Sequence, residues 1–243
     1  MKENKSAFIS SIDPVGMMTS LSGVVLGVLL AVADYRVEYG VAVSVVAASA
    51  LLHMYMSSGS RYFLAASLAG AFLVTWLSFG TVLKLEPILL LLFSYFVIRL
   101  GKGIRDSGRV IEAVVNCLLY GPVALFGAYF VCSHSFGFGL LMIPALSVGL
   151  LSVAVAGLKD GYGKNITAIL VAAALVLMTV FSFMRIFNPS HYLYLLTVPA
   201  FAYIIIRMYT KKEQDPVSCR PALSLSVFAM AVLAGIGFVA YLF

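Results

Sequence analysis

The chain has 243 residues, of which 62% are hydrophobic and only 11% are charged, and its mean hydropathy is +1.05. Soluble domains are about 45–50% apolar and about 25% charged, so this composition excludes a soluble globular domain. It also excludes a disordered chain, because so much apolar surface is not left in water. The apolar runs are continuous and do not alternate with polar residues, which favours membrane-spanning helices over the strands of a membrane barrel.

Nine apolar runs follow one another along the chain, and each is predicted to be a membrane-spanning helix, for which about 20 apolar residues are needed. Their approximate ranges are 16–33, 39–57, 62–80, 86–99, 110–132, 137–157, 166–184, 190–206 and 221–243. The connections are short, so neighbouring helices should run antiparallel. We therefore expect an all-α polytopic membrane protein, with residues 1–243 forming a single bundle of nine transmembrane helices.

The basic residues predict the orientation of this bundle. Thirteen of the 16 Lys and Arg residues fall on the side of the predicted N-terminus, and only Arg36, Lys84 and Arg185 fall on the other side. Cytoplasmic loops collect Lys and Arg, so we expect the N-terminus in the cytoplasm and Phe243 outside, as in a multi-pass protein of a bacterial cytoplasmic membrane. The same rule accounts for the net charge of +6 without a nucleic-acid partner.

Polar residues inside predicted spans are candidates for function, because they are costly in lipid. They include His53 and Asn116, with Glu112 near the start of its span. A lone His or Asn in a bundle is more often part of a hydrogen bond between helices. Gly23 and Gly27 form a G-x-x-x-G pattern that predicts close helix packing. The spacing of His and carboxylate residues predicts no metal site.

Two predicted cytoplasmic connections resemble each other. Residues 57–62 (SSGSRY) follow the second span and residues 157–164 (GLKDGYGK) follow the sixth, and both are small, glycine-containing and basic. Because they follow spans that end on the same side, we expect them at one end of the bundle. The candidate site residues in them are Ser60, Arg61, Tyr62, Lys159, Asp160 and Lys164.

Nine spans with such loops after the second and sixth resemble the UbiA-type membrane prenyltransferases, and most closely the dihydroxynaphthoate prenyltransferases of menaquinone biosynthesis. The best matching segment is 119–130 (LYGPVALFGAYF), which is similar to the fifth helix of that family. Segments 22–27 and 149–155 also resemble family segments, in the same order. The resemblance implies transfer of a prenyl group from a polyprenyl diphosphate to an aromatic acceptor, with Mg²⁺ as cofactor.

The sequence departs from the family at its metal-binding Asp motifs. Arg61 and Leu64 stand where the first motif has Asp, Lys164 replaces the last Asp of the second motif, and only Asp160 remains. Mg²⁺ prefers carboxylate and phosphate oxygens, and cations at these positions repel it. Asp160 is therefore the one catalytic candidate that the resemblance supplies, and Mg²⁺ is expected only if the family activity is retained. The family's opening Arg is Asp13 here.

Three interpretations remain open from the sequence. The first is a divergent family member that keeps the isoprenoid-binding fold and has lost most Mg²⁺–diphosphate ligands. It would bind a polyprenyl diphosphate or quinone-like lipid, or pair with another membrane protein. Its site would be a mostly apolar cavity with Ser60, Arg61, Asp160 and Lys164 at the mouth. The second is an active prenyltransferase in which Arg61 and Lys164 replace the metal, since both side chains bind phosphate. The third is an unrelated small transporter or membrane scaffold.

Overall fold

The computed structural model describes eleven stretches of the chain, all of them helices with short turns and caps. These stretches are 13–35, 37, 39–58, 62–63, 65–66, 69–70, 108–135, 138–159, 163–185, 188–210 and 216–240. No strand occurs among these residues. The all-helical part of the fold prediction is therefore confirmed for the described chain.

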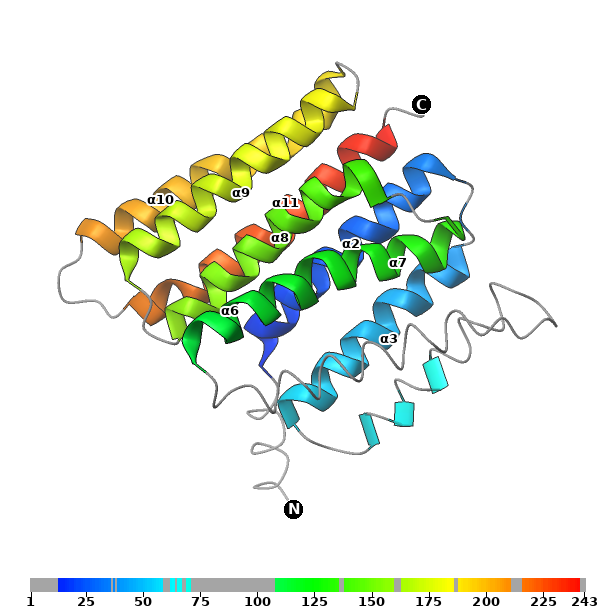
Figure 1. Cartoon of the computed structure of the whole chain (residues 1–243), viewed down its shortest axis with the longest axis horizontal. Helices are drawn as coiled ribbons and strands as arrows, with labels where there is room; N and C mark the ends of the chain where they lie inside the picture. Colours follow the sequence, from blue (N-terminus) through cyan, green and yellow to red (C-terminus); the bar gives the residue numbers. More distant parts are fainter. Residues whose placement is uncertain are drawn as a thin grey trace.

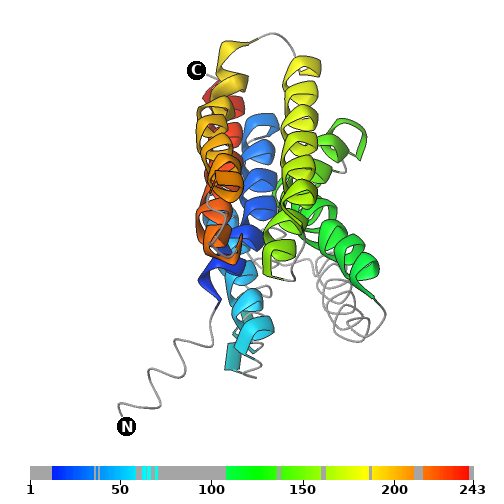
Figure 2. The ribbon, with the colours of Figure 1, turned by 90° about the vertical axis from the view of Figure 1, so that its left-hand side faces the viewer.

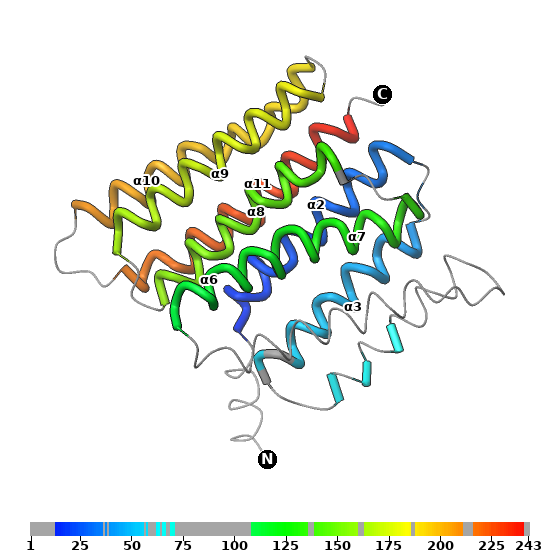
Figure 3. The backbone as a smooth tube through the Cα atoms, viewed as in Figure 1, coloured from blue at the N-terminus to red at the C-terminus, as the bar shows by residue number. Residues whose placement is uncertain are grey.

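The described helices run side by side and alternate in direction (Figure 1). In chain order they are α2 (Pro14–Asp34), α3 (Tyr39–Ser58), α6 (Arg109–Leu118), the π-helix η2 (Leu119–Val123), α7 (Ala124–Ser133), α8 (Phe138–Lys159), α9 (Lys164–Met184), the 3₁₀ helix η3 (Pro189–Thr197), α10 (Val198–Thr210), the 3₁₀ helix η4 (Pro216–Cys219) and α11 (Arg220–Val239). Consecutive elements from α6 to α7, from η3 to α10 and from η4 to α11 each form one rod. Figure 3 shows the first of these as a continuous coil.

Six helices are long and apolar enough to cross a membrane: α2, α8, α9 and the three rods just described. Helix α3 contributes a shorter apolar helix, Tyr39–Tyr55. These seven correspond to seven of the nine predicted spans, so the chain is a multi-pass membrane protein by helix length and composition. The other two predicted spans, 62–80 and 86–99, lie largely or wholly outside the described residues. The described part of the chain therefore matches seven of the predicted spans and does not support the predicted count of nine.

Helix α2 occupies the centre of the bundle. It packs against α11 and α7 along much of its length and also against α3 and α8. Its Leu26 and Leu30 are fully buried. Figure 2 shows α9 and α10 as separate columns at the edge of the bundle, where α9 packs mainly on α8, and η3 with α10 packs on α11.

Two glycines let α2 and α7 approach closely. A Cβ atom at Gly23 would lie 2.4 Å from the backbone oxygen of Tyr120, and one at Gly27 would lie 2.4 Å from that of Leu125. Both distances are too short for a real carbon atom, so no larger residue fits at either position. The prediction that this G-x-x-x-G pattern packs helices together is confirmed.

The segment that most resembles the prenyltransferase family contains the π-helix η2. Pro122 lies inside this rod and cannot donate the usual backbone hydrogen bond, and the wider π turn accommodates it. The preceding Gly121 lets the rod contact α8, because a Cβ there would lie 2.3 Å from the Ala145 oxygen. Close packing of the backbone explains the small residues of this segment.

Candidate functional site

One end of the bundle, called the Asp13 end below, is where both predicted loops begin. Helix α2 starts there at Asp13, α3 and α8 finish there, and α6 and α9 start there (Figure 1). Of the predicted site residues at this end, Tyr62 and Lys159 are exposed and Lys164 is half-buried.

Ser60, Arg61 and Asp160 lie outside the described residues, so the predicted convergence of these side chains at a cavity mouth stays a prediction. Within the described part of the chain, neither Lys159 nor Lys164 forms an ion pair or a side-chain hydrogen bond. No described residue therefore competes for either lysine side chain.

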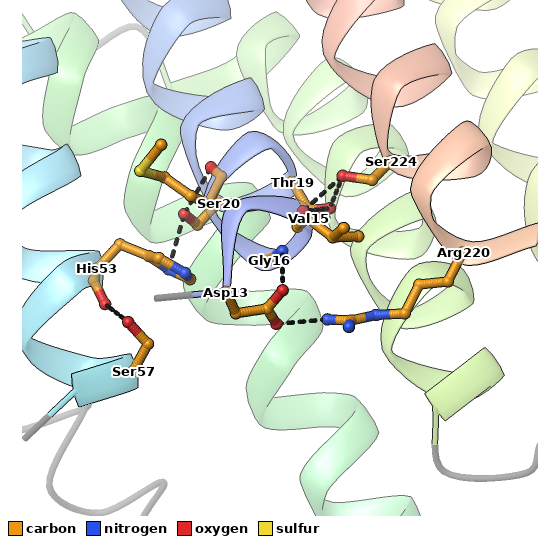
Figure 4. Close-up of polar contacts among 10 residues, drawn as sticks. Asp13, Val15, Gly16, Thr19, Ser20, His53, Ser57, Arg220 and Ser224 are labelled. Atoms are coloured by element: carbon orange, nitrogen blue, oxygen red, sulfur yellow. Dashed lines mark hydrogen bonds and ion pairs between the residues drawn. The ribbon is translucent and has the colours of Figure 1, made fainter. Parts of the chain in front are cut away.

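An ion pair connects Asp13, at the start of α2, to Arg220, at the start of α11. Arg220 Nη2 lies 2.6 Å from Asp13 Oδ2, although the two residues are 207 positions apart. The other carboxylate oxygen, Asp13 Oδ1, accepts a hydrogen bond from the Gly16 amide at 3.0 Å, which caps α2, and Pro14 occupies the first helical turn. Figure 4 shows Asp13 between Arg220 and His53.

The contacts of Asp13 set its charge. Burial alone would raise the pKa of this carboxyl, but the hydrogen bonds from Arg220 and Gly16 outweigh it and hold the pKa below its usual range. Asp13 is therefore ionised at neutral pH and fully engaged as a helix cap and ion-pair partner. This carboxylate is not placed to act as an acid or base on a substrate.

A second contact between α2 and α11 is built from hydroxyl groups. Thr19 Oγ1 lies 2.8 Å from Ser224 Oγ, and Ser224 also donates to the backbone oxygen of Val15. Thr19 and Ser224 are buried. These bonds satisfy hydroxyls that would otherwise be costly inside a membrane bundle.

His53 connects α3 to α2. Its Nδ1 lies 3.0 Å from Ser20 Oγ, and the His53 side chain is 92% buried, since 8% of it is exposed. The expectation that this residue makes a hydrogen bond between helices is confirmed. Its other ring nitrogen, Nε2, is also buried and has no hydrogen-bond partner among the described residues.

The opposite end of α2 carries a second ion pair. Arg185 donates to both carboxylate oxygens of Asp34, at 2.7 Å each, and the Tyr129 hydroxyl donates to Asp34 Oδ2 at 2.8 Å. The Arg185 guanidinium carbon also lies 5.6 Å from the ring centre of Phe181 and 5.8 Å from that of Phe238. This forked geometry is the strong form of an Arg–carboxylate contact.

No set of three or more His, Cys, Asp or Glu side chains is grouped to hold a metal ion among the residues that the structure describes. The predicted carboxylate Asp160 is not one of those residues. The ion pairs found here were not predicted from the sequence, because each joins residues more than 150 positions apart. A local signal existed only for Asp13, since Asp followed by Pro is a typical start of a helix.

The sequence matches no protein-family model, and no curated protein is similar to it. What the structure supports is a multi-pass helical membrane protein in a lipid environment.

Proposed function

We propose that the chain is a divergent UbiA-type membrane protein that binds a polyprenyl diphosphate or a quinone-like lipid at the Asp13 end and no longer transfers the prenyl group. The family resemblance supplies the class of ligand. The long apolar tail of such a ligand can lie between membrane-spanning helices, in contact with lipid and away from water.

The observation that carries this proposal is a pair of lysines at the Asp13 end that no described residue engages, whereas Arg220 at the same end is held by Asp13. At the Asp13 end, Lys159 closes α8 and Lys164 opens α9, and neither has a partner among the described residues. At the opposite end, Arg185 is held by both oxygens of Asp34. Unpaired lysines attract phosphate as point charges, and they flank the loop where the family binds its diphosphate.

The retained Asp160 and the replaced motif positions argue for binding without transfer. A Mg²⁺ site needs oxygen ligands that offset the charge of the leaving diphosphate. Three of the four family Asp positions considered in the sequence carry Arg61, Leu64 and Lys164. Cations at these positions can hold an anion but cannot hold the metal.

The test is mass spectrometry of lipids that copurify with the full chain, followed by binding of an allylic diphosphate in phosphatidylcholine nanodiscs. We expect a bound isoprenoid lipid, and binding that is equal with Mg²⁺ and with chelator. Arg61→Gln with Lys164→Gln should weaken binding at least ten-fold, on the order of two lost charged contacts. The matched control is Lys84→Gln, a lysine predicted on the other side of the membrane, which should leave binding unchanged.

Copurification of ordinary phospholipid alone, together with no binding of the diphosphate, would overturn the proposal in favour of a transporter or scaffold. Turnover that is insensitive to chelator and lost in Arg61→Ala would show instead an active enzyme with an altered site.

A further inference from the structure

His53 and Asp13 meet at the same glycine of α2. A Cβ atom at Gly16 would lie 2.8 Å from Asp13 Oδ2 and 3.3 Å from His53 Cε1. The carboxylate and the imidazole therefore border the space that the missing side chain leaves. Figure 4 shows the Asp13 carboxylate with Arg220 on one side and His53 on the other.

The hydrogen bonds of Ser20 assign the proton of the neutral imidazole. Ser20 has a single hydroxyl proton and lies 3.0 Å from both the Met17 backbone oxygen and His53 Nδ1. Both contacts are hydrogen bonds only if Ser20 donates to Met17 and accepts from a proton on Nδ1. This tautomer is assigned from the bonding pattern, as is usual for histidine. A second proton must then enter at Nε2, the nitrogen that is buried without a partner.

We propose that protonation of His53 is a switch that draws Asp13 away from Arg220 and so loosens α11 from α2. The imidazolium would place a full positive charge beside a carboxylate that Arg220 and the Gly16 amide hold at present. Shared between two cations, the carboxylate binds each of them less tightly. The same charge would fasten α3, which ends just before the predicted first loop, more firmly to α2.

Among the described residues, the charged groups near His53 are Asp13 and Arg220. Helix α2 presents Asp13, and Arg220 of α11 reaches the same carboxylate from the other side. Helix α7, which also packs on α3, has no Asp, Glu, Lys, Arg or His between Ala124 and Ser133. The hydrogen bonds from Arg220 and Gly16 hold the pKa of Asp13 below its usual range, which favours the charged carboxylate as the pH falls.

The experiment is a double-mutant cycle on the full chain in detergent micelles. Asp13→Asn, Arg220→Gln and the double variant are unfolded at about pH 8 and about pH 4. The lower value lies well below the range in which an exposed histidine titrates, because burial disfavours the charged imidazole. We expect a coupling of about five-fold in the unfolding equilibrium constant at the higher pH, the size for a partly exposed ion pair. At the lower pH the coupling should fall below about two-fold.

The same cycle in a His53→Gln background is the matched control, because Gln keeps a polar side chain that does not titrate. There the coupling should be equal at both pH values. A coupling that does not change with pH in the parent chain, or that falls equally in His53→Gln, would overturn the proposal.

A second measurement does not depend on the folding of the Asp13 and Arg220 variants. The NMR signal of ¹⁵N-labelled arginine at Arg220 should shift with pH in the parent chain and stay constant in His53→Gln. A signal that is constant in both, or that shifts in both, would contradict the switch.

Discussion

Replacing Gly23 or Gly27 by Ala tests the contact on which the centre of the bundle depends. The new Cβ would lie 2.4 Å from a backbone oxygen of the η2–α7 rod at either position, and 3.1 Å from the Cβ of Ala124 or Ala128. Both backbone contacts are about 1 Å short of ordinary van der Waals distance. A backbone oxygen inside a helix cannot turn away as a flexible side chain does, so the helices must separate.

The expected change in the free energy of unfolding combines two opposing effects. Overpacking costs about 1–3 kcal/mol, and a rigid backbone partner puts these sites in the upper part of that range. Ala gains about 1 kcal/mol over Gly as a helix former. Each substitution should therefore lower the free energy of unfolding by about 1–2 kcal/mol. The double variant should lose less than the sum, because the first separation relieves the second clash.

Denaturant unfolding in detergent micelles, followed by circular dichroism, measures these changes. Gly139→Ala is the matched control, because this helical glycine has no atom within 4 Å of its Cβ position. It should leave the stability equal or slightly higher. If Gly23→Ala and Gly27→Ala both unfold like the parent chain, the close approach of α2 and α7 is wrong.

Three further outcomes are expected. Stability from the Asp13 contacts should be present above the ordinary Asp pKa and be lost as the pH falls through the lowered pKa of this residue; acid unfolding of Asp13→Asn compared with the parent chain checks this. Purified chain given an allylic diphosphate and dihydroxynaphthoate should show no Mg²⁺-dependent prenyl transfer. The reason is that each lost electrostatic group at a reaction centre costs roughly 10²–10³ in rate. Turnover that is abolished by chelator would refute this expectation. A reporter that works only in the cytoplasm should be silent when fused after Phe243, and activity there would show that the predicted span count or orientation is wrong.

Apolar runs and their spacing were sufficient to predict where the described helices lie. Helices α8 and α9, at Phe138–Lys159 and Lys164–Met184, start and finish within a few residues of the predicted 137–157 and 166–184. The runs carry this information because a membrane helix is defined by its own composition. Hydropathy does not distinguish helix types, so the π turn at Leu119–Val123 and the 3₁₀ helix at Pro189–Thr197 were not predicted.

The contacts at the candidate site were likewise predicted only in part. His53 stood out in the sequence because a histidine in an apolar helix is rare, and the same reasoning anticipated its hydrogen bond to another helix. Nothing near Arg220 or Arg185 indicated a partner, because an ion pair between distant residues exists only once the helices are packed. The predicted loop residues Ser60, Arg61 and Asp160 rest on the family resemblance alone.

The two carboxylates at the ends of α2 have a consequence for the order of assembly. Asp34 finds its arginine 151 residues later in the chain and Asp13 finds its arginine 207 residues later. During synthesis α2 therefore enters the membrane before either arginine partner has been made. It cannot complete its contacts until α11 has emerged from the ribosome. A chain stopped before residue 220 would leave Asp13 without its arginine, so the packing of α2 on α11 depends on synthesis of a segment more than 200 residues away.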